Sequence, residues 1–179
     1  MSERDHFLLL ATYNEWMNVK LYEAAATLPA EELCADKGAF FGSLMGTLNH
    51  IVAGDTIWLK RFATHPARHS ALEPMQAMAA PQGLAHIFSM DLPTLAAQRR
   101  TLDAIIGAWV QQLTDDDLAH TLHYASMSGV VSDKRLSSVL LHFFNHQTHH
   151  RGQASTLLFQ AGVDVGATDL AVLIPNEEA

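Results

Sequence analysis

The sequence contains a single cysteine and no long run of apolar residues. With Cys34 alone, the 179-residue chain cannot form an internal disulfide, and nothing else in it points to an oxidising compartment. No stretch approaches the roughly 20 consecutive apolar residues that span a bilayer, and residues 1–6 have mixed charge, unlike a signal peptide. We therefore expect a cytoplasmic protein without a membrane-spanning segment.

Positive charge is also scarce. The 11 Lys and Arg residues are outnumbered by 19 Asp and Glu, which gives a formal net charge of −8. This charge opposes non-specific attraction to phosphate backbones. The short basic clusters Arg99-Arg100 and Lys134-Arg135 are interpreted as solvated charges at helix ends. We expect no nucleic-acid partner.

Several common catalytic motifs are missing. The chain has no glycine-rich phosphate loop, no Gly-x-Ser-x-Gly elbow and no His-Glu-x-x-His. Residues 135–160 contain no glutamate, so a di-iron bundle of the ferritin kind would lack its ligands. Cys34 is the sole candidate thiol nucleophile, and its place between two expected helices favours a structural role.

The distribution of apolar residues predicts an all-α protein with long helices over 5–28, 41–64, 92–113 and 135–160. Asp91 is a good N-cap for the third of these, with Pro93 in its first turn, and Gly162 supplies a stop after the fourth. The expected architecture is a four-helix bundle that forms a single domain over residues 1–179.

Two connections are expected to be distinctive. Residues 65–90 lose their periodicity and gather prolines, which is typical of a long crossover between the second and third helices, with room for a short helical turn. Leu122 and Tyr124 then alternate with polar neighbours before Ser128-Gly129, which predicts a small β-hairpin between Leu118 and Lys134, just before the fourth helix.

Histidine is unusually abundant. Eleven histidines equal all the Lys and Arg together, and imidazole is the commonest metal ligand. His146 and His150 are four residues apart on the helix 135–160, so they stand one turn apart on one face. Val139, Phe143 and Leu157 share that face, which is therefore inward, whereas His142 and His149 flank it toward polar neighbours.

A third ligand would have to come from another helix, and His50 is the only histidine of the helix 41–64. Gly54 lies one turn further along on the same side. Glycine costs about 1 kcal/mol relative to alanine inside a helix, so Gly54 is expected to leave space beside the His50 imidazole. Three neutral nitrogen ligands are typical of a catalytic metal site with one position open.

The alternative for each of these histidines is a hydrogen-bonded role in the core. The remaining histidines lie near a terminus, in loops or on the hairpin and are interpreted as surface residues: His6, His65, His69, His86, His120 and His123.

Three segments of the chain resemble the DinB-like family. They are ATYNEWMNVKLYEA (11–24), GTLNHIVAGDTIWLKRF (46–62) and NHQTHHRGQASTLLFQAGVDVGATDL (145–170). The resemblance implies a four-helix bundle that holds one divalent metal ion, often zinc or nickel, through His50, His146 and His150. It also implies frequent homodimers.

A second apolar stripe on the last helix offers a surface for such a dimer. Leu141, Phe144 and Phe159 face away from the histidines. Burial of the stripe against the chain's own tail or first helix is the alternative.

The resemblance also implies an activity. Relatives with known reactions are thiol S-transferases that use bacillithiol, mycothiol or glutathione, and a mycothiol-dependent maleylpyruvate isomerase. The hypothesis is thus a metal-dependent S-transferase acting on a small substrate and a low-molecular-weight thiol, with metal-bound water or thiolate as the reactive species. A metal-dependent hydrolase and a non-catalytic metal-binding stress-response protein remain alternatives.

Four further residues are candidates to support the metal ligands. Asp55 falls among apolar positions, where an unpaired carboxylate would be costly. Arg151 is a candidate partner for it, and a bond to a ligand histidine is the alternative. Asn14 and Asn18, one turn apart near the start of the chain, could orient a histidine or hold the bundle together.

Overall fold

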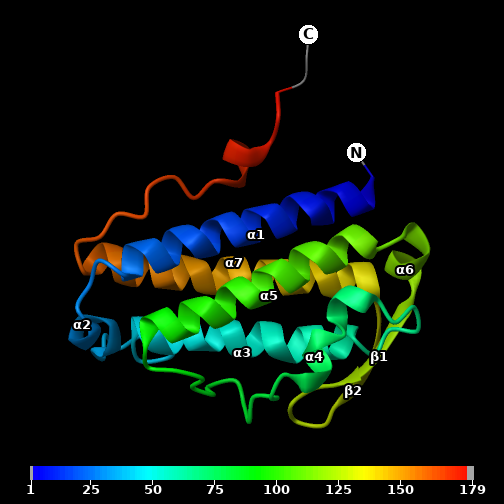
Figure 1. Cartoon of the computed structure of the whole chain (residues 1–179), viewed down its shortest axis with the longest axis horizontal. Coiled ribbons are helices and arrows are strands. Elements are labelled where there is room, and N and C mark those ends of the chain that lie inside the picture. The colour runs from blue at the N-terminus through cyan, green and yellow to red at the C-terminus, as the bar shows by residue number, and fades with distance from the viewer. Residues whose placement is uncertain (1, 177–179) are drawn as a thin grey trace.

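The computed structural model describes residues 2–176 and is mostly helical, with one small two-stranded antiparallel sheet (Figure 1). Its elements in chain order are α1 (Glu3–Ala25), α2 (Ala30–Cys34), α3 (Leu44–Phe62), η1 (Ser70–Leu72), α4 (Pro74–Ala77), α5 (Leu92–Gln112), α6 (Asp115–Ala119), β1 (Thr121–Ala125), β2 (Val131–Arg135), α7 (Leu136–Gln160) and η2 (Leu170–Leu173). The four long helices and the hairpin expected from the sequence are present.

The ends of the long helices follow from side-chain caps. The Ser43 hydroxyl accepts the Gly46 N–H at 3.1 Å, so α3 begins three residues later than predicted. Gly42, at φ +75°, closes a tight turn just before it. Asp91 caps α5 as expected by accepting the Thr94 N–H at 3.0 Å. Gly162, at φ +83°, follows the end of α7, as predicted.

Two short helices, α2 and α6, were not predicted from the sequence. Each has five residues, too few to show a helical period. Leu118 belongs to α6, so the hairpin begins at Thr121 instead of Leu118. Its strands pair from Thr121 opposite Arg135 to Ala125 opposite Val131.

The long helices pack in pairs. Both α1 and α3 contact α5 and α7. Because α3 and α5 run in the same direction (Figure 1), the chain between them must return along the molecule, which accounts for the predicted crossover. This segment contains η1 and α4, the short helical turns for which the sequence left room.

Aromatic side chains from three of the long helices meet in the core. Phe62 of α3 stacks on Trp109 of α5 with ring centroids 4.7 Å apart, and Phe143 of α7 meets Phe62 edge-on at 5.6 Å. The C-terminal tail returns along α1, where the Tyr13 hydroxyl donates to the Thr168 carbonyl at 2.6 Å. Among residues 2–176, no helix is long and apolar enough to cross a membrane.

Candidate metal centre

His50 of α3 meets His146 and His150 of α7. The Nε2 atom of His50 lies 3.3 Å from His146 Nε2 and 3.0 Å from His150 Nε2. His50 and His150 are buried, and His146 is partly buried. The structure therefore brings together the three predicted ligands in a cluster that could hold a metal ion.

The outer nitrogens of two of these rings are fixed by hydrogen bonds. His50 Nδ1 lies 2.7 Å from the Leu84 carbonyl oxygen, and His150 Nδ1 lies 2.7 Å from Gln153 Oε1. Because these oxygens only accept, both Nδ1 atoms carry the hydrogen and, in the neutral rings, both Nε2 atoms carry lone pairs. Two lone pairs that face each other at 3.0 Å repel unless a cation lies between them.

The cluster favours neutral imidazoles. Burial, reinforced by the neighbouring His150 and His50, lowers the pKa of His146 to about 3. Burial also lowers the pKa values of His50 and His150. All three side chains are therefore neutral near pH 7, which is the protonation state that binds metal.

The packing of the three rings depends on Phe41 and Gly54. The Phe41 ring stacks on His50 with centroids 3.8 Å apart. A Cβ atom at Gly54 would lie 2.9 Å from His146 Cε1. The space at Gly54 was expected to lie open beside His50, and it is instead occupied by the His146 ring, because α3 and α7 pack together here.

A cavity of about 410 Å³ opens beside His146. Trp58, Arg61 and His142 are in its wall. The Arg61 guanidinium lies 4.5 Å from the centre of the Trp58 ring and donates to the Ala125 carbonyl at 2.9 Å, so its charge is held at the cavity. The histidine cluster thus borders a space large enough for a small molecule.

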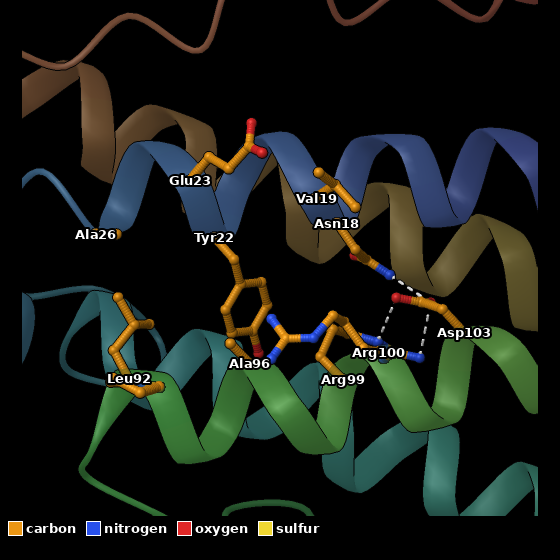
Figure 2. A pocket seen from close by; sticks show the side chains of 11 residues that line it. Asn18, Val19, Tyr22, Glu23, Ala26, Leu92, Ala96, Arg99, Arg100 and Asp103 are labelled. Atoms are coloured by element: carbon orange, nitrogen blue, oxygen red, sulfur yellow. Dashed lines mark hydrogen bonds and ion pairs between the residues drawn. The ribbon is translucent and has the colours of Figure 1, made fainter.

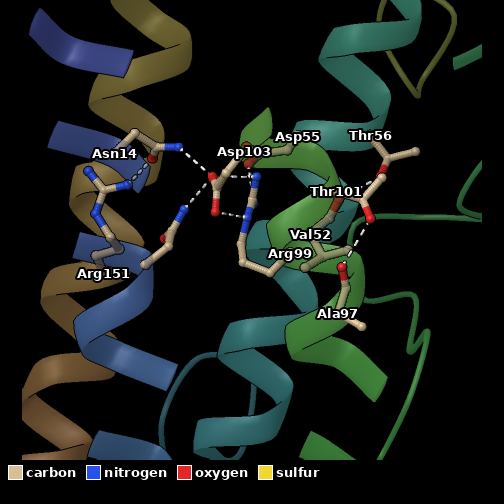
Figure 3. Close-up of polar contacts among 10 residues, drawn as sticks. Asn14, Val52, Asp55, Thr56, Ala97, Arg99, Thr101, Asp103 and Arg151 are labelled. Atoms are coloured by element: carbon tan, nitrogen blue, oxygen red, sulfur yellow. Dashed lines mark hydrogen bonds and ion pairs between the residues drawn. The ribbon is translucent and has the colours of Figure 1, made fainter. Parts of the chain in front are cut away.

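Asp55 is fully buried one turn after Ile51 on α3, and its partner is Arg99 of α5 (Figure 3). Arg99 also pairs with Asp103 at 3.0 Å and is 2% exposed. The expected partner Arg151 does not form this ion pair. The interpretation of Arg99 as a solvated charge was wrong, because tertiary packing turns it into the core.

Asn14 and Asn18 form hydrogen bonds with Asp103 (Figure 3). Within residues 2–176, neither of them is hydrogen-bonded to any of the three clustered histidines. Asn14 and Asn18 donate to Asp103 Oδ1 at 3.0 and 2.8 Å. Arg151, directly after His150, donates to Asn14 Oδ1. Burial raises the pKa of Asp103 to about 6 against the opposing charge of Arg99. This network links α1, α5 and α7.

A second cavity, of about 340 Å³, lies between α1 and α5, and Asn18, Arg99 and Asp103 of this network are among the residues that line it (Figure 2). Tyr22 and Arg99 extend into the gap between the two helices, and Leu92 and Ala96 add apolar surface. Burial raises the pKa of the Tyr22 hydroxyl. None of the three clustered histidines lines this cavity.

Several other sequence interpretations need correction. His65 and His69, expected on the surface, have side chains only 4% and 7% exposed. Phe144 of the proposed dimer stripe is buried and stacks against Phe7 of α1 at 6.4 Å, which was the stated alternative. Cys34, expected to be structural, is exposed at the end of α2.

Sequence reasoning missed three contributors to the site. Leu84 contributes its backbone carbonyl, and a contact of a backbone atom cannot be predicted from the residue type. Phe41 was assigned to a helix, although it lies in the turn before α3. Gln153 could have been found, because it follows His150 by three residues and so lies on the same helical face.

Comparisons with known proteins identify the family of the chain. The profile of the DinB family matches residues 1–178. Protein DinB of Bacillus subtilis (strain 168) is 25% identical over 170 residues, which cover 95% of this chain and 94% of that protein. No solved structure matches the chain. The chain belongs to the DinB family.

Proposed function

We propose that this chain binds one divalent metal ion, zinc or nickel, through Nε2 of His50, His146 and His150, and that it is a thiol S-transferase. The observation that carries the proposal is the fixed orientation of His50 and His150, whose Nδ1–H bonds aim both Nε2 lone pairs at one point. Bonds of Leu84 and Gln153 to the outer nitrogens are typical of metal-ligating histidines.

The spacing of the three nitrogens supports the same proposal. Zinc–nitrogen bonds of about 2.0–2.1 Å in a tetrahedral site place two ligand nitrogens about 3.4 Å apart. The separations of 3.0 and 3.3 Å require only a small expansion of the cluster. Three histidine ligands would leave a fourth position of a tetrahedral ion open, and the cavity beside His146 would give a small molecule access to it.

The residues of this cavity suit a small thiol and an electrophile. When bound, the metal supplies a Lewis acid that favours the ionised thiol at neutral pH. Burial lowers the pKa of His142, which is therefore a neutral imidazole able to accept the thiol proton. Arg61 attracts an anionic group of the substrate, and Trp58 offers an apolar wall. The thiol sulfur then bonds to the electrophilic atom, whose leaving group departs with its electron pair.

The architecture proposed for this activity is the four-helix bundle of α1, α3, α5 and α7, in a single domain. A homodimer remains part of the proposal. Leu141 and Phe159 on α7 are 56% and 73% exposed and are available for a contact between two copies. Light scattering on the purified protein should give twice the mass of one chain, and a monomer at all concentrations would remove the dimer from the proposal.

Metal binding is tested by zinc titration of untagged, metal-free protein. Substitutions of residues that only support metal ligands lower metal affinity by roughly 10-fold to 100-fold. We expect His146→Ala to lower zinc affinity by more than this. His123→Ala is the matched control, because His123 is exposed on the hairpin. Equal zinc stoichiometry and equal affinity of the wild type and His146→Ala would contradict the three-histidine site.

Activity is tested with 1-chloro-2,4-dinitrobenzene and a panel of low-molecular-weight thiols. The wild type loaded with zinc or nickel should release chloride and form the thioether, and His146→Ala should not. Turnover of an ester without any thiol would favour the hydrolase. Metal binding without either reaction would favour the non-catalytic alternative.

A further inference from the structure

A second group of potential ligands lies at the end of the molecule near α6 and the hairpin (Figure 1). His65 follows α3, His69 precedes η1, and Asp117 belongs to α6. Each offers one ligand atom, and these atoms lie within 4.8 Å of one another. The three residues are not shared with the cluster of His50, His146 and His150.

The spacing of these side chains is too long for hydrogen bonds. His65 Nδ1 lies 3.8 Å from Asp117 Oδ1, and His69 Nε2 lies 3.8 Å from Asp117 Oδ2. Two ligand atoms on one tetrahedral zinc ion are about 3.4 Å apart, given bond lengths of about 2.0–2.2 Å. Each of the two nitrogen–oxygen separations is therefore about 0.4 Å longer than this value, and all three ligand atoms lie within 4.8 Å of one another.

Buried nitrogens in this group lack partners. His69 Nε2, which faces the carboxylate, and His65 Nε2 are inaccessible to solvent and have no hydrogen-bond partner within residues 2–176. His65 Nδ1 accepts only a long bond, 3.2 Å, from the Ala67 N–H. A buried polar atom without a partner costs free energy, and an ion between the rings and the carboxylate would remove that cost for His69 Nε2.

The backbone holds the three ligands in place independently of any ion. Asp117 is fixed by Thr114, whose N–H and hydroxyl donate to Oδ2 at 2.9 and 2.7 Å. Between the two histidines, Arg68 takes the left-handed conformation, φ +46°, which is uncommon for a residue with a side chain. This turn sets the two imidazole rings 5.5 Å apart.

The site also has access and a further potential ligand. A cavity of about 700 Å³ opens beside His65 and His69, so a hydrated ion can reach them. The exposed His120 ring lies 4.6 Å from the His65 ring. Water or His120 can therefore complete the coordination.

We propose that His65, His69 and Asp117 form a second binding site for a divalent transition-metal ion of the zinc type. Two neutral imidazoles and one carboxylate are a donor set that zinc accepts. The ion would connect the segment after α3 to α6, two parts of the chain that are far apart in sequence. Because it binds the folded chain and not the unfolded one, it would also stabilise the fold by mass action.

The test isolates this site by removing the other one. In untagged His146→Ala/His150→Ala protein, we expect one equivalent of zinc to bind in a calorimetric titration and to raise the Tm. Adding His69→Ala should lower zinc affinity by more than about 100-fold, beyond the range of outer-shell changes, and abolish the rise in Tm. Adding His123→Ala should change neither.

A second variant separates binding from folding. Asp117→Asn keeps an acceptor for the Thr114 cap and removes the charged ligand, so the helix should persist while zinc affinity falls. Asp116→Asn, one residue earlier in α6, is its control. The proposal is overturned if the His146→Ala/His150→Ala protein binds no zinc, or if neither His69→Ala nor Asp117→Asn weakens its binding.

Discussion

A glycine allows the His146 ring to lie against α3. At Gly54, an alanine Cβ would stand 2.9 Å from His146 Cε1, so the ring would have to move away from His50. We expect Gly54→Ala to reduce zinc affinity at the three-histidine site by roughly 10-fold to 100-fold, the range seen when ligand orientation is disturbed.

The control for this variant is Gly107→Ala. A Cβ at Gly107, inside α5, meets nothing within 4 Å. This substitution should raise the free energy of unfolding by about 0.5–1 kcal/mol, because alanine has the better helix propensity, and leave zinc binding unchanged. Unchanged zinc affinity in Gly54→Ala would show that His146 does not need its present position.

Gln153 is the other residue whose role is local. Its Oε1 atom accepts the His150 Nδ1–H at 2.7 Å and so fixes the tautomer of that ring. Gln153→Met removes the hydrogen-bond acceptor and leaves a side chain of similar size. We expect zinc affinity to fall by about 10-fold to 100-fold, whereas Gln153→Glu should keep it. Equal loss in both variants, measured by competition with a chelator, would point to packing instead of hydrogen bonding.

Among the elements, α3 and α5 are joined by a buried ion pair that includes none of the three clustered histidines. Removing Arg99 leaves Asp55 and Asp103 buried without their counter-charge. Breaking a buried pair in this way costs about 3–5 kcal/mol, so Arg99→Met should lower the free energy of unfolding by that amount in a urea titration.

The neighbouring arginine supplies the matched control. Arg100 is exposed on the next position of α5. Arg100→Met should stay within about 0.5 kcal/mol of the wild type, as surface changes do. A similar small loss for Arg99→Met would mean that the buried network contributes little to the packing of α5 on α3.

The same elements show what the sequence can predict. Long helices such as α1 and α7 bury one face and expose the other, so the spacing of their apolar residues, and the shared face of His146 and His150, can be predicted from the sequence. The five-residue helices α2 and α6 show no period. The partner of Asp55 could not be predicted because Arg99 lies on another helix, and only packing decides which buried charges meet.

The second histidine group illustrates the same limit. His65 and His69 lie in a segment without periodicity, which resembles any surface loop in sequence. They are buried because η1 is fastened to α5, where the Gln112 amide donates to Ser70 Oγ at 3.1 Å and accepts the Ala71 N–H at 3.2 Å. Their meeting with Asp117 depends on that contact.

For the whole molecule, the lowered pKa values predict how stability depends on pH. The pKa of His146 is about 3 in the folded protein and near 6.5 in the unfolded chain. Between these values the His146 side chain is protonated in the unfolded chain and not in the folded chain, so its contribution to the free energy of unfolding rises with pH and levels off above about 6.5.

We therefore expect the Tm of metal-free protein to fall as the pH is lowered from about 7 to 5, where the unfolded-state histidines become protonated. The decline should be shallower in His146→Ala, which lacks one of the perturbed groups. Thermal unfolding of the wild type and of His146→Ala across this pH range, in the presence of a chelator, measures the two pH dependences. Parallel curves would show that His146 does not contribute to the pH dependence.

X-ray absorption at the zinc edge of the His69→Ala protein, loaded with one equivalent of zinc, tests the three-histidine centre most directly. Removal of His69 leaves that centre as the expected place for the ion. We expect three imidazole nitrogens at about 2.0–2.1 Å and one further light atom, with no sulfur. A spectrum with fewer than three imidazoles, or with zinc bound by oxygen alone, would contradict it.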